Sequence, residues 1–326
     1  MAIPPFRTVA VFGATGQVGS AVLQALVHCK EQSFDIIAFV SPTSALEVKG
    51  ELSRVDVKRI DLLKATEEEL AGALQGADVV VSALGGSTLH KQRLIQDAAA
   101  IAGVRRFYPS EFGMRQVAWL PGPEAYVHPV WALKMKTVEE AMKHPAIKAG
   151  RMSYTIVGCG EFYDVPKEPL LCPWLNPNAN DYVIQAVGNP EAKMDYSSVH
   201  DLAAFLVASL CHPNLSENQD LGFCSDHISY SEIASLLQKH SGKPVRLNIT
   251  SPCQMRAILK NPSSAPKELQ TGSSFPVDFW MLLRHVQGLG DFWRPPGKLH
   301  NNWFPSVRPV SFDEYFAQLF KTSKDV

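Results

Sequence analysis

The sequence predicts an α/β protein, in which a doubly wound parallel sheet carries helices on both faces and a smaller part follows it. Through the first half of the chain, short apolar runs rich in β-branched residues alternate with stretches of helical period. A glycine-rich loop separates the first run from the first helical stretch. After about residue 160 this alternation ends, because the stretch DVPKEPLLCPWLNPNAN holds too much Pro and Asn for regular structure.

Each element of the first half follows from a local signal. The strand-like runs occupy residues 8–12, 35–40, 55–60, 78–84, 105–109 and 153–157. The helix signals are an apolar face over residues 17–29, a capping box at Thr66 and Glu69, a start at Ser87 or Thr88 with a stop at Gly103, and the run 130–143. This alternation is the pattern of strands covered by crossover helices.

The second half carries fewer periodic segments. We expect a loop over a cleft at 161–180 and a loop or lid at 261–274. Two helices are expected, one at 201–211 capped by His200 and Asp201, and one opened by the capping box of Ser229 and Glu232. Strands are expected near 221–224 and at 244–249. The last fifty residues hold Trp280, Trp293, Trp303 and several Phe, enough aromatic surface to line an apolar pocket.

Composition excludes several classes of function. The 31 Lys and Arg residues are balanced by 32 Asp and Glu residues. The chain therefore has no excess of positive charge with which to bind nucleic acid or an anionic membrane. The longest apolar stretch, residues 202–211, is too short to cross a bilayer. The six cysteines form no Cys-x-x-Cys pair, and a strand-like run follows the N-terminus almost directly. We therefore expect reduced thiols in a cytoplasmic protein, and either a monomer or a homodimer.

The loop FGATGQVG (12–19) joins the first strand to the first helix and predicts a dinucleotide site. Glycine at 13 permits a tight turn, glycine at 16 lets the backbone approach a pyrophosphate, and glycine at 19 lets helix and strand pack closely. Thr15, Gln17 and Val18 complete the loop, whose N–H groups would hold the phosphates. The alternative is a glycine-rich turn that binds no nucleotide.

The end of the second strand bears on which dinucleotide is bound. An acidic residue there would bind the ribose of NAD, and an arginine would hold the phosphate of NADP. The chain has neither, since Ser41, Pro42, Thr43 and Ser44 follow Val40. Without a carboxylate to repel a phosphate, we favour NADP, hydrogen-bonded by the three hydroxyls and by Lys49. Asp61, at the end of the third strand, either faces the adenine or caps the approach to the next helix.

Five motifs together resemble one known family. RRFYPSEFG (105–113), GATGQVG, DVVVSALGG, AAAIAGVRRF and CGEF (159–162) are similar to the isoflavone reductase-like, NmrA-type branch of the atypical short-chain dehydrogenases. That branch includes isoflavone, pinoresinol–lariciresinol and phenylcoumaran benzylic ether reductases. The similarity extends at lower strength along the whole chain. It departs at Ser41, where the family's reductases carry arginine.

The resemblance implies a Rossmann domain for NADPH over residues 1–160 and a mainly substrate-binding part over 161–326, with some segments returning to the sheet. It also implies one catalytic lysine on the helix after the Pro-Ser-Glu-Phe-Gly turn. The nicotinamide would lie near Ala83 and Phe162. Ser110 in that turn would help to place cofactor or substrate, or would serve the turn alone.

Two lysines compete for the catalytic position, and helical phase separates them. At about 100° per residue, Val138 and Ala141 lie within roughly 40° of Lys134, whereas Lys136 lies roughly 200° away beside Glu140. Lys134 is therefore on the apolar face, where burial disfavours the charged form and suits an amine that exchanges protons. From phase alone, a lysine that extends its amine to water is an equal interpretation. The resemblance favours Lys134 as the catalytic residue.

Other catalytic patterns are absent or broken. Tyr163 and Lys167 match the Tyr-x-x-x-Lys pair of other short-chain dehydrogenases, but Pro166 between them forbids the helical turn that the pair requires. The histidines show no metal-ligand spacing, and there is no G-x-S-x-G motif. The sequence thus predicts an NADPH-dependent reductase of a small phenolic or polyketide-like compound. The alternatives are a dinucleotide-sensing regulator without catalysis, and an isomerase or cyclase on the same fold.

Overall fold

The computed structural model describes residues 3–47, 50, 52–114, 127–166, 168–176, 178–271, 273 and 275–322. Its largest unit is a seven-stranded sheet in the order β10-β6-β5-β4-β1-β2-β3, in which every neighbouring pair is parallel. The strands are β1 Thr8–Phe12, β2 Asp35–Val40, β3 Val55–Arg59, β4 Val79–Ser82, β5 Arg106–Tyr108, β6 Ser153–Gly158 and β10 Gln219–Gly222. The order reverses between β1 and β4, which confirms the predicted doubly wound fold.

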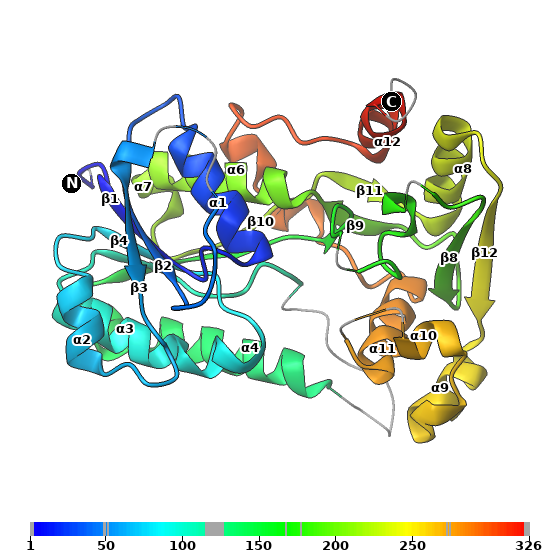
Figure 1. Cartoon of the computed structure of the whole chain (residues 1–326), viewed down its shortest axis with the longest axis horizontal. Coiled ribbons are helices and arrows are strands. Elements are labelled where there is room, and N and C mark those ends of the chain that lie inside the picture. The colour runs from blue at the N-terminus through cyan, green and yellow to red at the C-terminus, as the bar shows by residue number, and fades with distance from the viewer. Residues whose placement is uncertain are drawn as a thin grey trace.

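Helices cover both faces of this sheet (Figure 1). One face carries α1 Gln17–Val27 and α6 Val199–Cys211, and the short α7 Pro213–Ser216 follows α6. The other carries α2 Glu67–Ala73, α3 Gln92–Ile101 and α4 Pro129–Met142, followed by the short α5 Pro145–Lys148. Because the sheet is buried on both sides, alternate residues of one strand enter different cores. Val9 and Val11 pack toward α1, and Ala10 and Phe12 pack toward α2 and α3.

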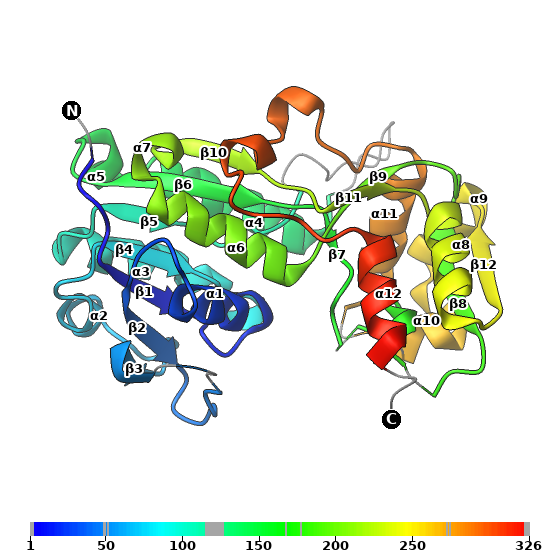
Figure 2. The ribbon, with the colours of Figure 1, turned by 90° about the horizontal axis from the view of Figure 1, so that it is seen from above.

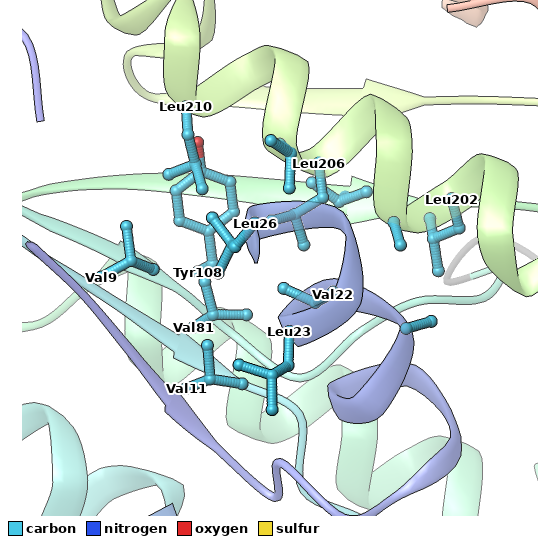
Figure 3. Close-up of a cluster of buried hydrophobic side chains, with 14 of the residues drawn as sticks. Val9, Val11, Val22, Leu23, Leu26, Val81, Tyr108, Leu202, Leu206 and Leu210 are labelled. Carbon is cyan, nitrogen blue, oxygen red and sulfur yellow. The ribbon is translucent and has the colours of Figure 1, made fainter. Parts of the chain in front are cut away.

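Figure 3 shows the first of these cores from close range. Side chains of the central strands, among them Val11 and Val81, face Val22 and Leu26 of α1, while leucines of α6 close the cluster from the other side. The phenol of Tyr108 extends the cluster and bonds the Ser209 hydroxyl at 3.0 Å. This packing of aliphatic side chains fixes α1, and with it the glycine loop at the start of α1, against the sheet.

Apart from α6, α7 and β10, most of the second half forms a separate lobe beside the sheet (Figures 1 and 2). It holds a three-stranded sheet in the order β11-β9-β7 and a parallel pair β12-β8. Its strands are β7 Glu161–Phe162, β8 Tyr182–Val187, β9 Met194–Ser197, β11 Asp226–Ile228 and β12 Val245–Thr250. Its helices are α8 Tyr230–Ser241, α9 Pro252–Lys260, α10 Lys267–Thr271, α11 Val277–Gly288 and α12 Phe312–Thr322. Aromatic rings dominate its core, where Phe312 packs against Tyr163 and Trp174.

Several boundary predictions are confirmed and others are wrong. Thr66 caps α2, and Ser229 and Glu232 form the predicted capping box of α8. The predicted helix start at Ser87 or Thr88 is wrong, because a 3-10 turn over Gly86–Lys91 precedes α3. The predicted loop at 261–274 contains the short helix α10.

The predicted cap of α6 is also wrong. The helix begins two residues before the predicted start, and its cap is Ser198, whose hydroxyl accepts a hydrogen bond from His200 N at 3.0 Å. Asp201 lies inside the first turn, where its carboxylate accepts from the Ser225 hydroxyl and from Val310 N. This side chain therefore ties α6 to the C-terminal segment instead of capping the helix.

Within the described ranges, no helix is both long enough and apolar enough to cross a membrane. All six cysteines are free thiols.

Candidate active site

Two cavities lie near the carboxyl ends of the parallel strands. The first, which we call the glycine-loop cleft, measures about 340 Å³ and is lined by Gly13, Thr15, Gly16, Phe39, Val40, Ser41, Ile60, Asp61, Leu62, Leu63, Ala83, Leu84, Gly85 and Thr88. These residues lie at the ends of β1, β2, β3 and β4 or directly after them, on either side of the point where the strand order reverses. A cleft at this place in a doubly wound sheet is where such folds bind ligands.

The glycine loop is shaped by close approaches of backbone to backbone. Gly13 has a φ of +74°, and a Cβ atom there would lie 2.4 Å from the Ala83 carbonyl oxygen. A Cβ atom at Gly19 would lie 2.1 Å from the Gly13 carbonyl oxygen. Both positions therefore exclude any side chain. Gly19 and Val18 do not line the cleft, so their place is in the packing of α1 against β1.

The residues present fit a dinucleotide. Gly16 is the N-cap of α1, and no side chain of the described residues caps this helix. The first N–H groups of α1 are therefore available to an anion at the cleft, where the helix dipole also favours negative charge. A Cβ atom at Gly16 would stand 3.2 Å from the Gly13 carbonyl, which is a tight approach. Only a backbone without side chains leaves space for a pyrophosphate here.

Asp61 lies in the wall of the cleft and also stabilises its own turn. Its carboxylate accepts a hydrogen bond from Leu63 N at 3.1 Å and lies 3.7 Å from the Lys64 amine. Both interpretations from the sequence, a cleft residue and a cap, are thus compatible with its position. Lys49, the other residue considered for the ribose phosphate, lies outside the described residues.

The second cavity, which we call the lysine cavity, measures about 400 Å³. Its walls come from Gln17, Glu111, Phe112, Gly113, Met114, Trp131, Lys134, Met135, Gly160, Glu161, Phe162, Val165, Glu168, Leu171, Phe275, Phe279, Leu283 and Phe292. This volume is in the range of small-molecule sites, and most of the lining is apolar or aromatic. Gln17 belongs to this wall and directly follows Gly16 of the glycine-loop cleft, so the two cavities are neighbours.

Lys134 is in the wall of this cavity because of its phase on α4. Val138 and Ala141 are buried against the sheet, and Lys134 is half-buried at the edge of the same face. Its amine donates a hydrogen bond to the Glu111 carbonyl oxygen at 2.8 Å. Lys136 is on the solvated face, where its amine lies 3.8 Å from Glu140 as the spacing predicts.

The turn at residues 109–114 positions the carbonyl oxygen that accepts a hydrogen bond from the Lys134 amine. Phe112 has a φ of +51°, which is unusual for a bulky residue and is stabilised by neighbouring strands. Phe112 N donates to the Val157 carbonyl at 3.0 Å, and Cys159 N donates to the Gly113 carbonyl at 3.1 Å. The carbonyl that Lys134 binds is therefore part of a turn fastened to the end of β6.

Ser110 is buried within the same turn and lines neither of the two cavities. Its hydroxyl donates to the Leu84 carbonyl, and its N–H donates to Gln92 Oε1 at 2.6 Å. It joins the end of β5 to the segment after β4, which is the turn role considered for it. Phe162 does line the lysine cavity, and Ala83 lines the glycine-loop cleft.

Two arginines that sequence reasoning missed lie behind the lysine cavity. The Arg284 guanidinium bonds the Glu161 carboxylate at 3.1 Å, and both side chains are almost fully buried. Burial raises the pKa of Glu161, and the cation of Arg284 opposes this shift. Arg294 donates to the Gly113 carbonyl at 2.6 Å and passes over Gly158 and Gly222, where a Cβ atom would collide with its side chain. No local pattern marks either residue, because the partners are far away in the chain.

The aromatic prediction is right for the region and wrong for the tryptophans. Phe275, Phe279 and Phe292 line the cavity. Trp280 is buried beneath the Arg284 guanidinium, outside the cavity wall, and Trp293 and Trp303 are each 42% exposed.

Tyr163 lines neither the glycine-loop cleft nor the lysine cavity. Its hydroxyl donates to the Val310 carbonyl at 2.7 Å, and burial raises its pKa well above the usual range. Among the described residues, no group of three or more His, Cys, Asp or Glu side chains is placed to hold a metal ion.

Comparisons with known proteins agree with this architecture. The chain is 27% identical over 314 residues to an isoflavone reductase homologue of Zea mays, covering 94% of this chain and 96% of the relative. It is 26% identical over 237 residues to isoeugenol synthase 1 of Clarkia breweri, covering 71% and 72%. A leucoanthocyanidin reductase–NADPH complex from Vitis vinifera superposes with a TM-score of 0.70 at 17% identity, covering 96% and 99%, which shows a shared fold. Residues 5–275 match the model of the NmrA-like family, and the chain belongs to that family.

Proposed function

We propose that this protein is an NADPH-dependent reductase of a small phenolic, aromatic or polyketide-like compound, with Lys134 as general acid or base. The observation that carries the proposal is the place of the Lys134 amine. Lys134 is half-buried in the wall of an apolar cavity that adjoins the glycine-loop cleft. A proton-exchanging group and a nucleotide site side by side are the two parts that a hydride-transfer enzyme needs.

The glycine-loop cleft would hold the cofactor. Gly13, Thr15 and Gly16 would bind the pyrophosphate, Ser41 would face the ribose, and Asp61 would lie on the adenine side. Gln17, Ala83 and Phe162 would border the nicotinamide, where the two cavities meet. Bound NADPH would supply a hydride to an electron-poor carbon of the substrate.

The chain's own contribution is orientation and one proton. Aromatic walls at Trp131, Phe279 and Phe292 suit a flat ring and exclude water from it. The Lys134 amine would donate a proton to the oxygen on which charge develops, or accept one from it. Its hydrogen bond to the Glu111 carbonyl keeps the amine in place between turnovers.

The names of several relatives support the substrate class. They include isoeugenol and eugenol synthases, isoflavone reductase homologues and phenylcoumaran benzylic ether reductases. Each of these names refers to an aromatic compound. At identities of 22–27% the relatives support the general class, and the individual substrate has to be found by assay.

The test measures loss of NADPH absorbance at 340 nm over a panel of phenolic enones and benzylic ethers. We expect Lys134→Ala to reduce turnover by about 10²- to 10⁴-fold, the usual effect of losing a general acid or base. NADPH affinity, followed by tryptophan fluorescence, should stay as in the wild type. Lys136→Ala is the matched control, because Lys136 is on the same helix and faces solvent, and it should keep full activity. An active Lys134→Ala variant would contradict the assignment of Lys134 as general acid or base.

Two other outcomes of the assay point to other functions. Tight NADPH binding without turnover on any compound would indicate a dinucleotide-sensing regulator. Product formed without a change at 340 nm would indicate an isomerase or cyclase that keeps its cofactor.

A further inference from the structure

The ribose end of the glycine-loop cleft is built from two neighbouring strands. Ser41 follows β2 and lines the cleft, and Ile60 and Asp61 follow β3 and line it as well. Arg59, the last residue of β3, pairs in register with Val40, the residue before Ser41. Ile60 N then donates to the Val40 carbonyl at 3.0 Å, so the two strand ends stay together up to the cleft. Arg59 is thus a cationic residue that adjoins the ribose end.

The Arg59 side chain extends toward the loop that follows β2. Its Nη1 atom donates to the Ser44 carbonyl at 2.8 Å and approaches the Pro42 carbonyl at 3.5 Å. In the same loop the hydroxyls of Ser41 and Ser44 bond each other at 2.6 Å. The guanidinium and two hydroxyl groups are therefore gathered at one short segment, residues 41–44.

The charge of Arg59 is available, unlike that of its neighbours. Lys58 lies 2.9 Å from Asp56, and Lys64 lies 3.7 Å from Asp61. Arg59 forms no ion pair with any carboxylate in the described part of the chain, where its contacts are with uncharged carbonyl oxygens. It is exposed, so a ligand can reach the donors on the guanidinium that these carbonyls leave open.

We propose that Arg59 binds the ribose 2′-phosphate of the dinucleotide and so selects NADPH over NADH. This inference rests on the proposed function of the glycine-loop cleft. A 2′-phosphate is recognised by an arginine, whose planar fork of donors matches phosphate oxygens. The residue directly after β2 is Ser41, so this chain has no arginine at that position. Here a cation from the adjacent strand reaches the same loop, and the bonded Ser41 and Ser44 hydroxyls can together supply one further neutral donor.

The experiment measures dissociation constants of NADPH and NADH for the full chain by tryptophan fluorescence, in the wild type and in Arg59→Gln. We expect Arg59→Gln to weaken NADPH binding by about 10- to 100-fold, as for the loss of a charge-assisted hydrogen bond. NADH affinity should change by less than about twofold, because NADH has no 2′-phosphate. Adenosine 2′,5′-bisphosphate and 5′-AMP, as smaller probes, should show the same contrast.

Two further variants make the result specific to the charge at this site. Lys58→Gln removes the preceding cation of β3, which is paired with Asp56, and should leave both affinities unchanged. Adding Ser41→Arg to Arg59→Gln should restore NADPH binding, since it returns a guanidinium to the same loop. Retained NADH affinity shows that the Arg59→Gln chain is folded.

Several outcomes would overturn the inference. Equal weakening of NADPH and NADH by Arg59→Gln would mean that Arg59 only supports the loop. Retained NADPH preference in Arg59→Gln, together with its loss in Lys49→Gln, would assign the phosphate to Lys49. A wild type that binds neither dinucleotide would remove the proposed function as well. NADPH binding through Arg59 without turnover on any substrate would leave the inference standing and remove only the reductase.

Discussion

The glycine-loop cleft and the lysine cavity adjoin each other, yet they are built in different ways. The cleft is formed by backbone at the ends of consecutive parallel strands, and its shape depends on glycines that exclude side chains. The cavity is formed by side chains from α4, β7 and α11, held by buried charges and aromatic rings. Backbone contacts leave a site little freedom to change, whereas side-chain walls can be replaced one residue at a time. The cleft is therefore suited to an invariant ligand and the cavity to a variable one.

The largest expected effect is a loss of stability when the buried ion pair behind the lysine cavity is broken. Arg284→Met would leave the Glu161 carboxylate buried, with its side chain only 4% exposed and its cation gone. Removing one partner of a buried pair costs about 3–5 kcal/mol of unfolding free energy. Urea unfolding measures this loss. The double variant Arg284→Met with Glu161→Gln should recover part of it, and a loss below about 1 kcal/mol in the single variant would contradict the buried-pair assignment.

A smaller effect is expected where the cleft depends on backbone contact. Gly19→Ala places a Cβ atom 2.1 Å from the Gly13 carbonyl, so α1 must move away from the loop. Overpacking of this kind costs about 1–3 kcal/mol, and NADPH affinity should fall with it. Gly72→Ala in α2 is the control, because nothing lies within 4 Å of its Cβ position. It should stabilise the chain by roughly 0.5–1 kcal/mol. If both variants behave alike, the close approach at Gly19 has no energetic importance.

The smallest expected effect is a change in how stability depends on pH, and it comes from His128 beside the lysine cavity. Burial lowers the pKa of His128 from its ordinary value of 6.5, and Asp278 opposes the shift. The unfolded chain therefore binds a proton on this ring at higher pH than the folded chain, so the unfolding free energy falls as pH drops below about 6.5. His128 Nδ1 also accepts from Val130 N to cap α4, which protonation of that nitrogen would prevent.

His128→Asn keeps a capping oxygen and removes the titration. Unfolding of the variant between about pH 7 and 5 should depend less steeply on pH than unfolding of the wild type. Burial also lowers the pKa of His285 and His300, so some dependence should remain. Identical slopes for the two chains would show that His128 is protonated equally in the folded and unfolded states.

The same difference between the regions explains what the sequence could predict. The strands of the large sheet, the glycine loop and the phase of Lys134 against Lys136 follow from residues within one or two helical turns of each other. The strand ends and helix starts differ by a few residues where a nearby polar group competes, as Ser198 does at α6.

The support of the lysine cavity could not be predicted in this way. Arg284 meets Glu161 from 123 positions away, and Arg294 meets Gly113 from 181 positions away. Apolar periodicity carries no information about such pairs. Trp280, Trp293 and Trp303 looked like lining residues because aromatic side chains are large, but size alone does not indicate which ring faces a cavity and which packs under a guanidinium.

The path of the chain between the two lobes has a consequence for how the protein can be divided or recombined. After β6 the chain enters the second lobe at β7 and returns to the first lobe for α6 and β10. It leaves again for β11 and α8 to α11, passes Phe304 in the core of the first lobe, and ends with α12 in the second (Figure 2). A cut near residue 160 would strip the sheet of an edge strand and of one covering helix. Neither lobe is one continuous segment of the chain, so a new specificity has to be introduced by local changes within the intact chain and not by exchange of a lobe.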